Sequence, residues 1–403
     1  MRILNVTQSY APFFEFGGPP VKVRALSREL ARRGHQVTVL TADWKLEARF
    51  HGGEPPAGTT RSLFGWRQDD GGVQSIYLPT WLSYRALSWN PAVKRFARAR
   101  LQNFDVVHIF GLYDLLGPAI AAQCRAFNIP YVVEPIGMFL PIVRSFWKKR
   151  VYHSMFGREM LAGARFLIAT SKQEADELVS GGIPREKIFL RRNGVEVPAK
   201  MPARNAFRTK HSIAPGSKVI LFLGRLSSKK SPDLLLEAFS ALGAGLLQNQ
   251  DARLVFAGPD DEDLQKSLSQ SADRLGVATR VLFTGPLFDT AKWEAYRDAD
   301  VFVLPSQNEN FGNTAAEAVS AGTPVVVTEG CGVAPLLADT AGLVVTHDVT
   351  AVSQALQSLL TDPVLYARLS TGCGEVTARL GWQEPAEAME SLYRTLAPST
   401  PLV

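Results

Sequence analysis

The chain has 403 residues, of which 46% are hydrophobic and 20% charged, the composition of a soluble globular protein. This length exceeds one ordinary core and predicts two domains. No uninterrupted apolar run approaches the roughly 20 residues of a membrane span, and the N-terminus enters a strand directly, which argues against a signal peptide. Cys124, Cys331 and Cys373 match no metal-binding spacing and indicate thiols in a reducing compartment.

Strand-like apolar runs alternate with helical patterns along the whole chain. A first helix is expected over Val21–Arg33, because Val23, Leu26 and Leu30 recur at helical spacing and Gly34 closes it. The alternation predicts an α/β fold with two Rossmann-like, doubly wound domains that face a central cleft. The strands are expected at Ile3–Val6, Val37–Leu40, Val106–Phe110, Tyr131–Val133 and Phe166–Ala169, then at Val219–Leu223, Leu254–Phe256, Val281–Phe283, Val301–Leu304 and Pro324–Val327.

The proline- and charge-bearing stretch Val197–Arg204 separates the two series of strands and predicts a linker. The expected domains are therefore residues 1–197, an acceptor-binding domain, and 198–380, a nucleotide-sugar-binding domain. Residues 381–403 hold an amphipathic helix with Ala388, Leu392 and Leu396 at helical spacing. We expect this helix to pack back toward the first domain, and a terminal helix on the second domain is the alternative.

Charge is unevenly distributed between the two halves. Residues 1–200 hold 28 Lys and Arg against 16 Asp and Glu, whereas residues 201–403 hold 16 against 22. The basic half favours an anionic partner. Aromatic and basic residues interleave at 81–85, 89, 94–100 and 146–150, a mixture more typical of docking on anionic lipid headgroups than of nucleic-acid readout. Solvated helix faces beside ordinary core aromatics are the alternative.

Two glutamates, Glu309 and Glu317, bracket a predicted strand–loop–helix junction. Glu309 follows the apolar run Val301–Leu304, and Glu317 lies in the helix-forming run Thr314–Val319. Gly312 between them lets a ligand approach the backbone closely, and the helix start offers N–H groups and a positive dipole end to a phosphate. Ionised carboxylates accept hydrogen bonds from sugar hydroxyls. The segment thus has places for a sugar, a diphosphate and a ribose, although the pair alone also fits glycoside hydrolysis.

The second domain opens with a glycine and two cations at a strand end. Gly224 and Arg225 lie where the first strand of that domain turns toward a helix, the edge at which such sheets bind ligands, and Lys230 follows. Arg225 as a planar fork and Lys230 as a point charge are expected to reach a diphosphate. Each well-placed donor on a leaving phosphate is worth roughly 3 kcal/mol.

With these residues the chain resembles the retaining nucleotide-sugar glycosyltransferases of family 4, which have the GT-B fold. The resemblance rests on Phe222–Leu226 with Lys230, on Ser306–Glu317 followed by Ala318–Pro324, on Asn193–Glu196, and on Gly17-Gly18 after the first strand. It covers essentially the whole chain. Ser231 departs from the pattern, since a glycine usually follows the lysine.

The resemblance implies a role for each site residue. Arg225 and Lys230 would stabilise the departing nucleoside diphosphate, Glu309 would hold hydroxyls of the donor sugar, and Glu317 the ribose diol. The other donor-binding positions that it implies are Gly17, Gly18, Gly224, Asn310, Phe311, Gly312, Asn313 and Thr314.

Two residues near strand ends of the first domain carry weaker signals. The family often has a histidine where His108 lies, contacting the donor sugar near the reacting carbon; many members have a His-x-His pair, and Phe110 takes its second position here. Glu134 would bind an acceptor hydroxyl, although Ile136 departs from the basic residue usual nearby. The alternatives are a satisfied core histidine and a Glu134 paired with a nearby arginine.

Two acidic clusters raise a metal-site alternative. Asp261-Glu262-Asp263 and Asp298-Ala299-Asp300 hold the oxygen ligands that a hard cation bridging a diphosphate needs. We expect no metal and no cofactor, because the second cluster precedes a buried strand and because Arg225, Lys230 and helix N–H groups supply positive charge.

The sequence therefore predicts a cytoplasmic glycosyltransferase, peripheral on the inner face of a membrane, that moves a hexose from a UDP- or GDP-sugar with retention and without a metal. The acceptor would be a saccharide or lipid-linked saccharide in bacterial polysaccharide or glycolipid assembly, and no nucleic acid is expected. A nucleotide-sugar epimerase of GT-B architecture and a non-catalytic nucleotide-sugar-binding protein are the alternatives.

Overall fold

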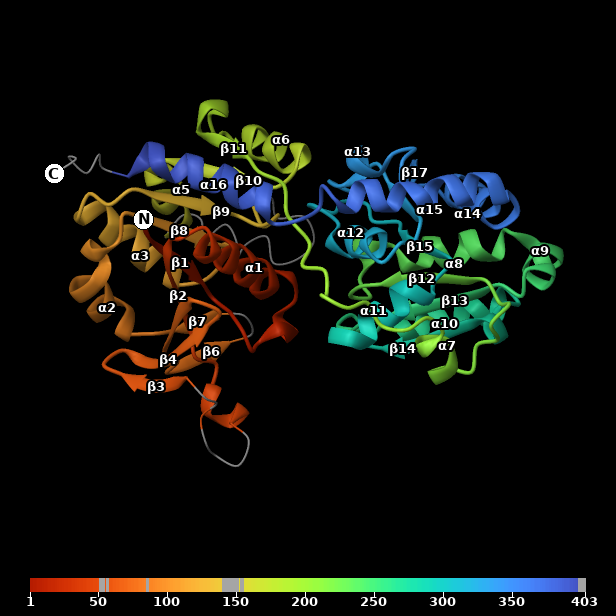
Figure 1. Cartoon of the computed structure of the whole chain (residues 1–403), viewed down its shortest axis with the longest axis horizontal. Coiled ribbons are helices and arrows are strands. Elements are labelled where there is room, and N and C mark those ends of the chain that lie inside the picture. Colours follow the sequence, from red (N-terminus) through yellow and green to blue (C-terminus); the bar gives the residue numbers. More distant parts are fainter. Residues whose placement is uncertain (51–54, 56–57, 85–86, 140–151, 153–155, 398–403) are drawn as a thin grey trace. The chain divides into compact units, whose positions relative to one another are not determined.

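The computed structural model describes residues 1–50, 55, 58–84, 87–139, 152 and 156–397 (Figure 1). The chain forms two compact units. Unit 1 comprises residues 1–194 together with 382 onward, and unit 2 comprises residues 195–381. The chain thus leaves unit 1 after Gly194 and returns to it at Trp382, within a few residues of the borders expected from sequence.

Unit 1 is built on a sheet that, in its described part, has nine strands in the order β11-β10-β9-β8-β1-β2-β5-β4-β3. Neighbours pair in parallel except at the β3–β4 and β4–β5 pairs, which are antiparallel. The strands are β1 (Arg2–Thr7), β2 (Gln36–Ala42), β3 (Thr59–Ser62), β4 (Gly65–Asp70), β5 (Val73–Leu78), β8 (Val106–Phe110), β9 (Tyr131–Glu134), β10 (Phe166–Ala169) and β11 (Ile188–Leu190), with a separate hairpin of β6 (Leu82–Tyr84) and β7 (Leu87–Trp89).

Helices cover this sheet and enclose two apolar cores. Ile3 belongs to one core and its strand neighbour Leu4 to the other, as strand alternation requires. The helices are α1 (Gly18–Arg32), α2 (Ala92–Arg100), α3 (Leu116–Ala126), α5 (Arg158–Gly163), α6 (Lys172–Ser180) and α16 (Gln383–Leu396), with short 3-10 turns η1 (Phe14–Phe16), η2 (Leu46–Arg49), η4 (Leu101–Asn103) and η6 (Arg185–Lys187).

Helix α16 packs on α1 and belongs to unit 1. Its apolar stripe places Ala386, Met389 and Tyr393 in the core beside Val23 and Leu26 of α1. Helix α16 therefore buries one face, as an amphipathic helix on a sheet-and-helix layer should. Of the three residues that sequence placed on this face, Leu392 belongs to the core and Leu396 packs against it, whereas Ala388 is half-buried and lies outside the core cluster.

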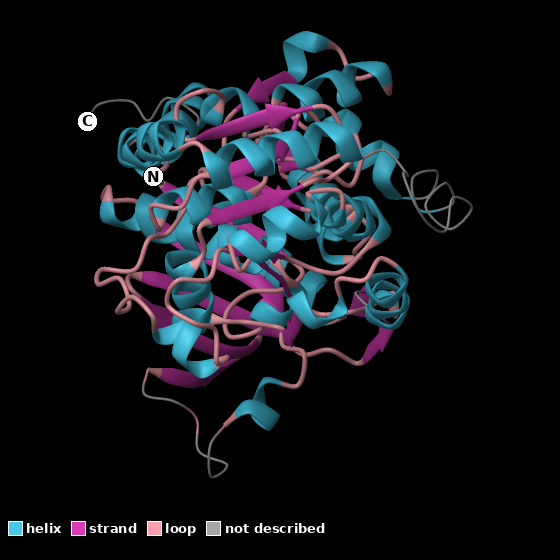
Figure 2. Cartoon of the chain, turned by 90° about the vertical axis from the view of Figure 1, so that its right-hand side faces the viewer, coloured by secondary structure: helices cyan, strands magenta, loops and turns pink. Residues whose placement is uncertain are grey.

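Unit 2 is built on a parallel sheet that, in its described part, has the order β14-β13-β12-β15-β16-β17. Its four inner strands, β13, β12, β15 and β16, are almost continuously apolar and buried, since helices lie on both faces (Figure 2), whereas the edge strands β14 and β17 are mostly half-buried. The strands are β12 (Val219–Leu223), β13 (Arg253–Ala257), β14 (Val281–Gly285), β15 (Val301–Leu304), β16 (Val325–Thr328) and β17 (Gly342–Val345); the helices are α7 (Ala206–Lys210), α8 (Pro232–Ser240), α9 (Gly243–Asn249), α10 (Leu264–Arg274), α11 (Asp289–Asp298), α12 (Asn313–Ser320), α13 (Ala334–Leu337), α14 (Val349–Thr361) and α15 (Pro363–Thr377), with turns η7 (Ser228–Lys230) and η8 (Ala278–Arg280).

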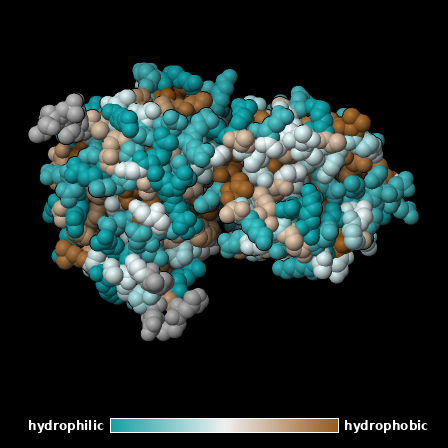
Figure 3. All heavy atoms as spheres, in the orientation of Figure 1, coloured by the Kyte–Doolittle hydropathy of each residue, from teal (hydrophilic) through white to brown (hydrophobic). Residues whose placement is uncertain are grey.

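The surface is mainly hydrophilic on the face that Figure 3 shows, with apolar residues in small scattered patches. Among the helices of the described residues, none is both long and apolar enough to cross a bilayer. The sequence-predicted aromatic and basic stretch at 146–150 lies outside the described residues, as does Arg85.

Candidate functional site

The junction between β15 and α12 forms the centre of the candidate site in unit 2. After the buried strand β15, the chain crosses a polar segment to Gly312, which caps α12 with a left-handed φ of 95°. A Cβ at Gly312 would lie 3.1 Å from Cγ1 of Val333, and any other residue would be strained at this positive φ. Glycine therefore suits this turn. Asn313 and Thr314 are the first two residues of α12, and sequence predicted that the N–H groups near them meet a diphosphate.

The loop that carries Glu309 is fixed by the segment after β16. The backbone N–H of Glu309 donates to the carbonyl of Gly330 at 2.8 Å, and Gly332 N–H donates to the carbonyl of Glu309 at 2.9 Å. The N–H of Val333 likewise donates to Phe311, whose side chain is buried. The carboxylate of Glu309 is therefore presented from a rigid backbone rather than from a free loop.

Lys230 and Glu309 form an ion pair at this junction. Lys230 Nζ donates to Glu309 Oε2 at 2.6 Å, and both side chains keep about a fifth of their surface exposed. The Lys230 stem lies over Gly224, because a Cβ at that glycine would be 3.5 Å from Lys230 Cδ. The structure thus joins three sequence-predicted positions that are up to 85 residues apart.

The structure shows how a serine fits at position 231, directly after Lys230. Its φ is 49°, in the left-handed region that glycine adopts without cost. Its hydroxyl lies 2.9 Å from Nε2 of His347. The serine therefore occupies a backbone conformation that favours glycine, and its hydroxyl also donates to the carbonyl of Ser228 at 3.4 Å.

Arg225 forms its ion pair with a carboxylate other than Glu309. Its guanidinium is half exposed and pairs with the half-exposed Asp261 at 3.0 Å. Such an exposed pair contributes little and exchanges readily. Arg225 is therefore available to an anionic ligand at the strand end where sequence placed it.

Glu317 is held by helix α11. Lys292 Nζ donates to its Oε1 at 2.8 Å and the Tyr296 hydroxyl donates to its Oε2 at 2.9 Å. Burial first, and Glu317 second, raise the pKa of Tyr296 far above its usual value, so this phenol stays a donor. Sequence reasoning missed both partners, although their i, i+4 spacing on one helix was readable.

The second acidic cluster of the metal alternative has structural partners. Asp298 accepts from the N–H groups of Asn205, Phe207 and Arg208. Asp300 pairs with Arg208 at 2.8 Å and with Lys218 at 3.1 Å. These carboxylates connect α7 to the amino end of β15, an inner strand of the sheet.

Gly17 and Gly18 lie where predicted in unit 1, between β1 and α1. Gly17 caps α1 with a φ of 93°, and its N–H donates to the carbonyl of Phe14 at 3.0 Å. Gly18 begins the helix. A glycine pair therefore forms the helix start that follows the first strand.

His108 and Glu134 lie in a buried polar network in unit 1. Glu134 is fully buried and pairs with Lys22 of α1 and with Arg191, which follows β11. His108 is the third residue of β8, two residues before the strand end near which sequence had placed it. Its Nδ1 lies 2.6 Å from the Tyr393 hydroxyl and its Nε2 3.5 Å from Glu134 Oε2.

This network favours structural roles for both residues. A contact between either side chain and a sugar would require the network to open, because neither residue has exposed surface. Sequence analysis gave the pairing of Glu134 with an arginine as one of two alternatives, and the structure contains this pairing. The sugar contact of His108 and the acceptor contact of Glu134 stay predictions.

Burial decides the ionisation of this network. Burial lowers the pKa of His108 to about 3, despite the nearby charge of Glu134. Burial opposes the Glu134 carboxylate, but Arg191 and Lys22 outweigh it and lower the pKa of Glu134 to about 2. The folded protein therefore holds a neutral His108 beside an ionised Glu134.

We expect unit 1 to lose stability as the pH falls from 6.5 to 4.5. In this range an unfolded His108 takes up a proton that the folded protein excludes, so acid favours unfolding. Glu134 acts in the same direction only below about pH 4.5, the usual pKa of a glutamate. Denaturant unfolding of His108→Asn, which preserves a polar atom near Tyr393, should show a shallower slope against pH by about one proton. An unchanged slope, or an equal change in the exposed His347→Asn control, would contradict this assignment.

Comparison with known proteins shows the family of the chain. Residues 17–194 match the "Glycosyl transferase 4-like domain" and residues 203–372 match "Glycosyl transferases group 1". A D-inositol 3-phosphate glycosyltransferase of Xylanimonas cellulosilytica is 29% identical, over 94% of this chain and 91% of that protein. The D-inositol 3-phosphate glycosyltransferase 1 of Catenulispora acidiphila is 31% identical, over 73% of this chain and 72% of that protein. The match to the Streptomyces bingchenggensis enzyme of the same name is 35% identical and spans 55% of that protein.

Solved structures establish the fold class. Anabaena Alr3699/HepE, solved in complex with UDP and glucose, has a TM-score of 0.73 at 17% identity, over 98% of this chain and 100% of that one. Sucrose-phosphate synthase from Thermosynechococcus elongatus has a TM-score of 0.70 at 20% identity, over 98% of each chain. Two Rossmann-like units with cations and carboxylates at a strand-end helix start define a glycosyltransferase of the GT-B fold. The chain belongs to the GT4-type glycosyltransferase family.

Proposed function

We propose that this glycosyltransferase moves a hexose from a nucleoside diphosphate sugar to an acceptor hydroxyl with retention of configuration and without a metal ion. The observation that carries the proposal is the Lys230–Glu309 pair beside the N-terminal end of α12. The fold brings the cation and the carboxylate together beside this helix start: the cation and the helix start suit the diphosphate, Glu309 suits the sugar, and Glu317 within the helix suits the ribose.

The residues divide the donor between them in this proposal. Lys230, Arg225 and the first N–H groups of α12 hold the diphosphate and stabilise the charge that develops on it as the sugar leaves. Glu309 holds sugar hydroxyls, and Glu317 holds the ribose diol. The departing phosphate helps to deprotonate the acceptor, which attacks from the same face, and no protein nucleophile takes part.

The names of the relatives and neighbours support a substrate class. Relatives are named for an inositol phosphate acceptor, and one neighbour was solved with UDP and glucose. Together with the basic first half, they support a UDP-sugar donor ahead of a GDP-sugar and an anionic acceptor. A lipid-linked saccharide in polysaccharide or glycolipid assembly meets the same charge requirement.

One assay tests this function against the epimerase and the non-catalytic binder. The protein is incubated with UDP-, GDP- and ADP-sugars, with and without inositol phosphate or lipid-linked saccharide acceptors. Nucleotide release and sugar identity are followed by chromatography, and anomeric configuration by NMR. Acceptor-dependent release with a retained anomer supports the proposal. A changed sugar without release supports the epimerase, and binding without either reaction supports the non-catalytic protein.

Lys292 gives a specific prediction for the ribose end of the donor. Lys292→Met frees Oε1 of Glu317, so the carboxylate should lose its fixed direction toward the ribose diol. We expect calorimetry to show about tenfold weaker binding of UDP but little change for 2′,3′-dideoxy-UDP, because only the former has the hydroxyls at stake.

The exposed Lys266→Met, also in unit 2, is the matched control and should bind both nucleotides as the wild type does. Equal losses for the two nucleotides in Lys292→Met would show that the lysine acts on some other part of the ligand.

We also propose peripheral contact with an anionic membrane on the cytoplasmic side through unit 1. Helix α2 supports it, since Lys94, Arg95, Arg98 and Arg100 all lie on its exposed side. In the described part of the chain none of these four residues forms an ion pair. Such a surface attracts anionic headgroups by roughly 1 kcal/mol per basic residue.

A further inference from the structure

A pocket of about 490 Å³ opens in unit 1 between helices α2, α3 and α5. Most of its lining is apolar. Trp89 and Val93 contribute from β7 and α2, Leu116 and Ala119 from α3, and Phe156 and Met160 from the start of α5 and the residues before it. This pocket is separate from the candidate donor site, since none of the donor-site residues lines it.

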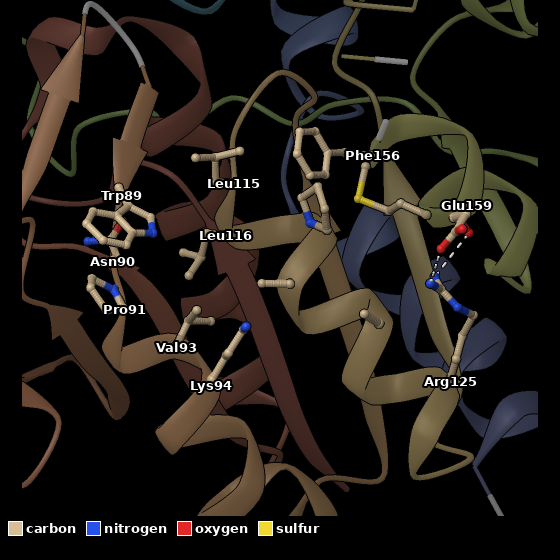
Figure 4. Close-up of a pocket in the computed structure, with 14 residues that line it drawn as sticks. Trp89, Asn90, Pro91, Val93, Lys94, Leu115, Leu116, Arg125, Phe156 and Glu159 are labelled. Carbon is tan, nitrogen blue, oxygen red and sulfur yellow. Dashed lines mark hydrogen bonds and ion pairs between the residues drawn. The ribbon is translucent and has the colours of Figure 1, made fainter. Parts of the chain in front are cut away.

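Among the charged residues that line the pocket, two form an ion pair with each other and one does not. Arg125 donates to Glu159 at 2.8 Å, so the two charges at that end neutralise each other (Figure 4). Lys94 reaches toward the pocket from α2, is exposed, and forms no ion pair within the described residues (Figure 4). The pocket therefore offers an apolar interior with one uncompensated positive charge beside it.

The surface beside the pocket is apolar and aromatic. The β6–β7 hairpin exposes 69% of Trp81, 66% of Leu82 and 47% of Trp89. The two indoles stack edge to face with centroids 5.9 Å apart, which holds them in place. Exposed large apolar side chains gathered beside basic residues are typical of a surface that enters the headgroup layer of a bilayer.

We propose that the pocket binds one hydrocarbon chain of an anionic membrane lipid whose phosphate lies against Lys94. The inference rests on the membrane contact proposed above and adds a specific lipid site to it. Charge complementarity favours an anionic occupant, because Lys94 is the one charged lining residue without an ion pair among the described residues, and the apolar interior favours a hydrocarbon chain over an acidic protein segment. Chain burial and headgroup attraction are each weak alone, and stable anchoring needs both.

Soluble lipids test the pocket without a bilayer. Lysophosphatidylglycerol, below its critical micelle concentration, is titrated into the full-length protein by calorimetry. Lysophosphatidylcholine, which has the chain without net charge, and glycerophosphoglycerol, which has the charge without the chain, are titrated in parallel. The wild type should bind the first at least tenfold more tightly than either of the others. Similar affinity for all three would overturn the inference.

A variant with a filled pocket provides a second test of the lipid site. Ala119→Phe with Ala122→Leu places bulk into the pocket from the partly exposed side of α3, and the melting temperature confirms that the variant folds. We expect at least tenfold weaker lysophosphatidylglycerol binding, whereas Ala367→Phe, on an exposed position of α15, should bind as the wild type does. Unchanged binding in the filled variant would overturn the pocket site.

Vesicle sedimentation separates this inference from the membrane contact on which it rests. The wild type should sediment with phosphatidylcholine vesicles containing phosphatidylglycerol and not with pure phosphatidylcholine. Lys94→Gln, Arg95→Gln and Arg98→Gln together should abolish this, unlike the matched exposed set Lys210→Gln, Lys266→Gln and Arg379→Gln. No recruitment of the wild type would overturn both proposals.

Recruitment that persists in full after the pocket is filled, together with unchanged lysolipid binding, would overturn the chain site alone. Analytical ultracentrifugation completes the test. A wild-type dimer that becomes a monomer when the pocket is filled would show that a second copy of the chain covers this face, which also overturns the lipid site.

Discussion

A protein carrying Glu309→Gln should transfer sugar at least about tenfold more slowly than the wild type. Glutamine keeps the shape of the side chain but removes the charge, so it loses both the strong acceptor for sugar hydroxyls and the ion pair that holds Lys230 at 2.6 Å. Turnover is measured with saturating donor, because the effect belongs to the reacting complex and not to donor capture.

Lys230→Met and Arg225→Ala should lower turnover by a similar factor or more, since each removes a cation from the leaving diphosphate. Asp233→Asn, which neutralises an exposed carboxylate at the start of α8 in the same unit, is the control and should leave turnover unchanged. Near-normal rates in Glu309→Gln and Lys230→Met would show that the β15–α12 junction is not the reaction site.

The second large effect concerns stability. Glu134→Gln should destabilise unit 1 by about 3–5 kcal/mol, the usual cost of breaking a buried ion pair from one side. The substitution leaves Lys22 and Arg191 buried without a counter-charge, whereas in the wild type both pair with this carboxylate. Two cations would then repel each other where water cannot screen them.

Hydrogen exchange measures this effect unit by unit. Amides of β8, β9 and α16 should lose protection in Glu134→Gln, and those of β12 and β15 should keep it. Asp176→Asn breaks an exposed pair with Arg185 at 3.7 Å and should cost less than about 1 kcal/mol. Equal protection of unit 1 in wild type and Glu134→Gln would mean that the network contributes nothing to the fold.

Most of the parallel strands were readable from sequence because burial on both faces leaves continuous apolar runs. Val106–Phe110, Phe166–Ala169, Val219–Leu223 and Val301–Leu304 have the expected bounds in the structure. Antiparallel β3 and β4 were missed, as were the parallel strands β5, β11 and β17. The residues of β3 and β4 are mostly exposed or half-buried and include charged and small side chains, so no apolar run marks these two strands.

The parts of the site that lie close together in sequence were predictable, and those that are far apart in sequence were not. Glu309, Gly312 and Glu317 lie within nine residues, and a strand–loop–helix junction explains them without long-range knowledge. The partners of Glu134 and Glu317 come from elements that sequence does not bring together. Lys22 and Arg191 lie 112 and 57 residues from Glu134, so only the folded sheet order makes them neighbours.

The return of the chain to unit 1 at Trp382 has a consequence for synthesis. When residue 194 leaves the ribosome, the first core still lacks Ala386, Met389 and Tyr393 of α16, and His108 lacks its hydroxyl partner. At about 5–20 residues per second, α16 follows some 10–40 seconds later. All of unit 2 is translated in that interval. Unit 2 therefore has its whole chain available before unit 1 does, although unit 1 is begun first. Unit 1 receives its last helix, α16, only at the end of synthesis.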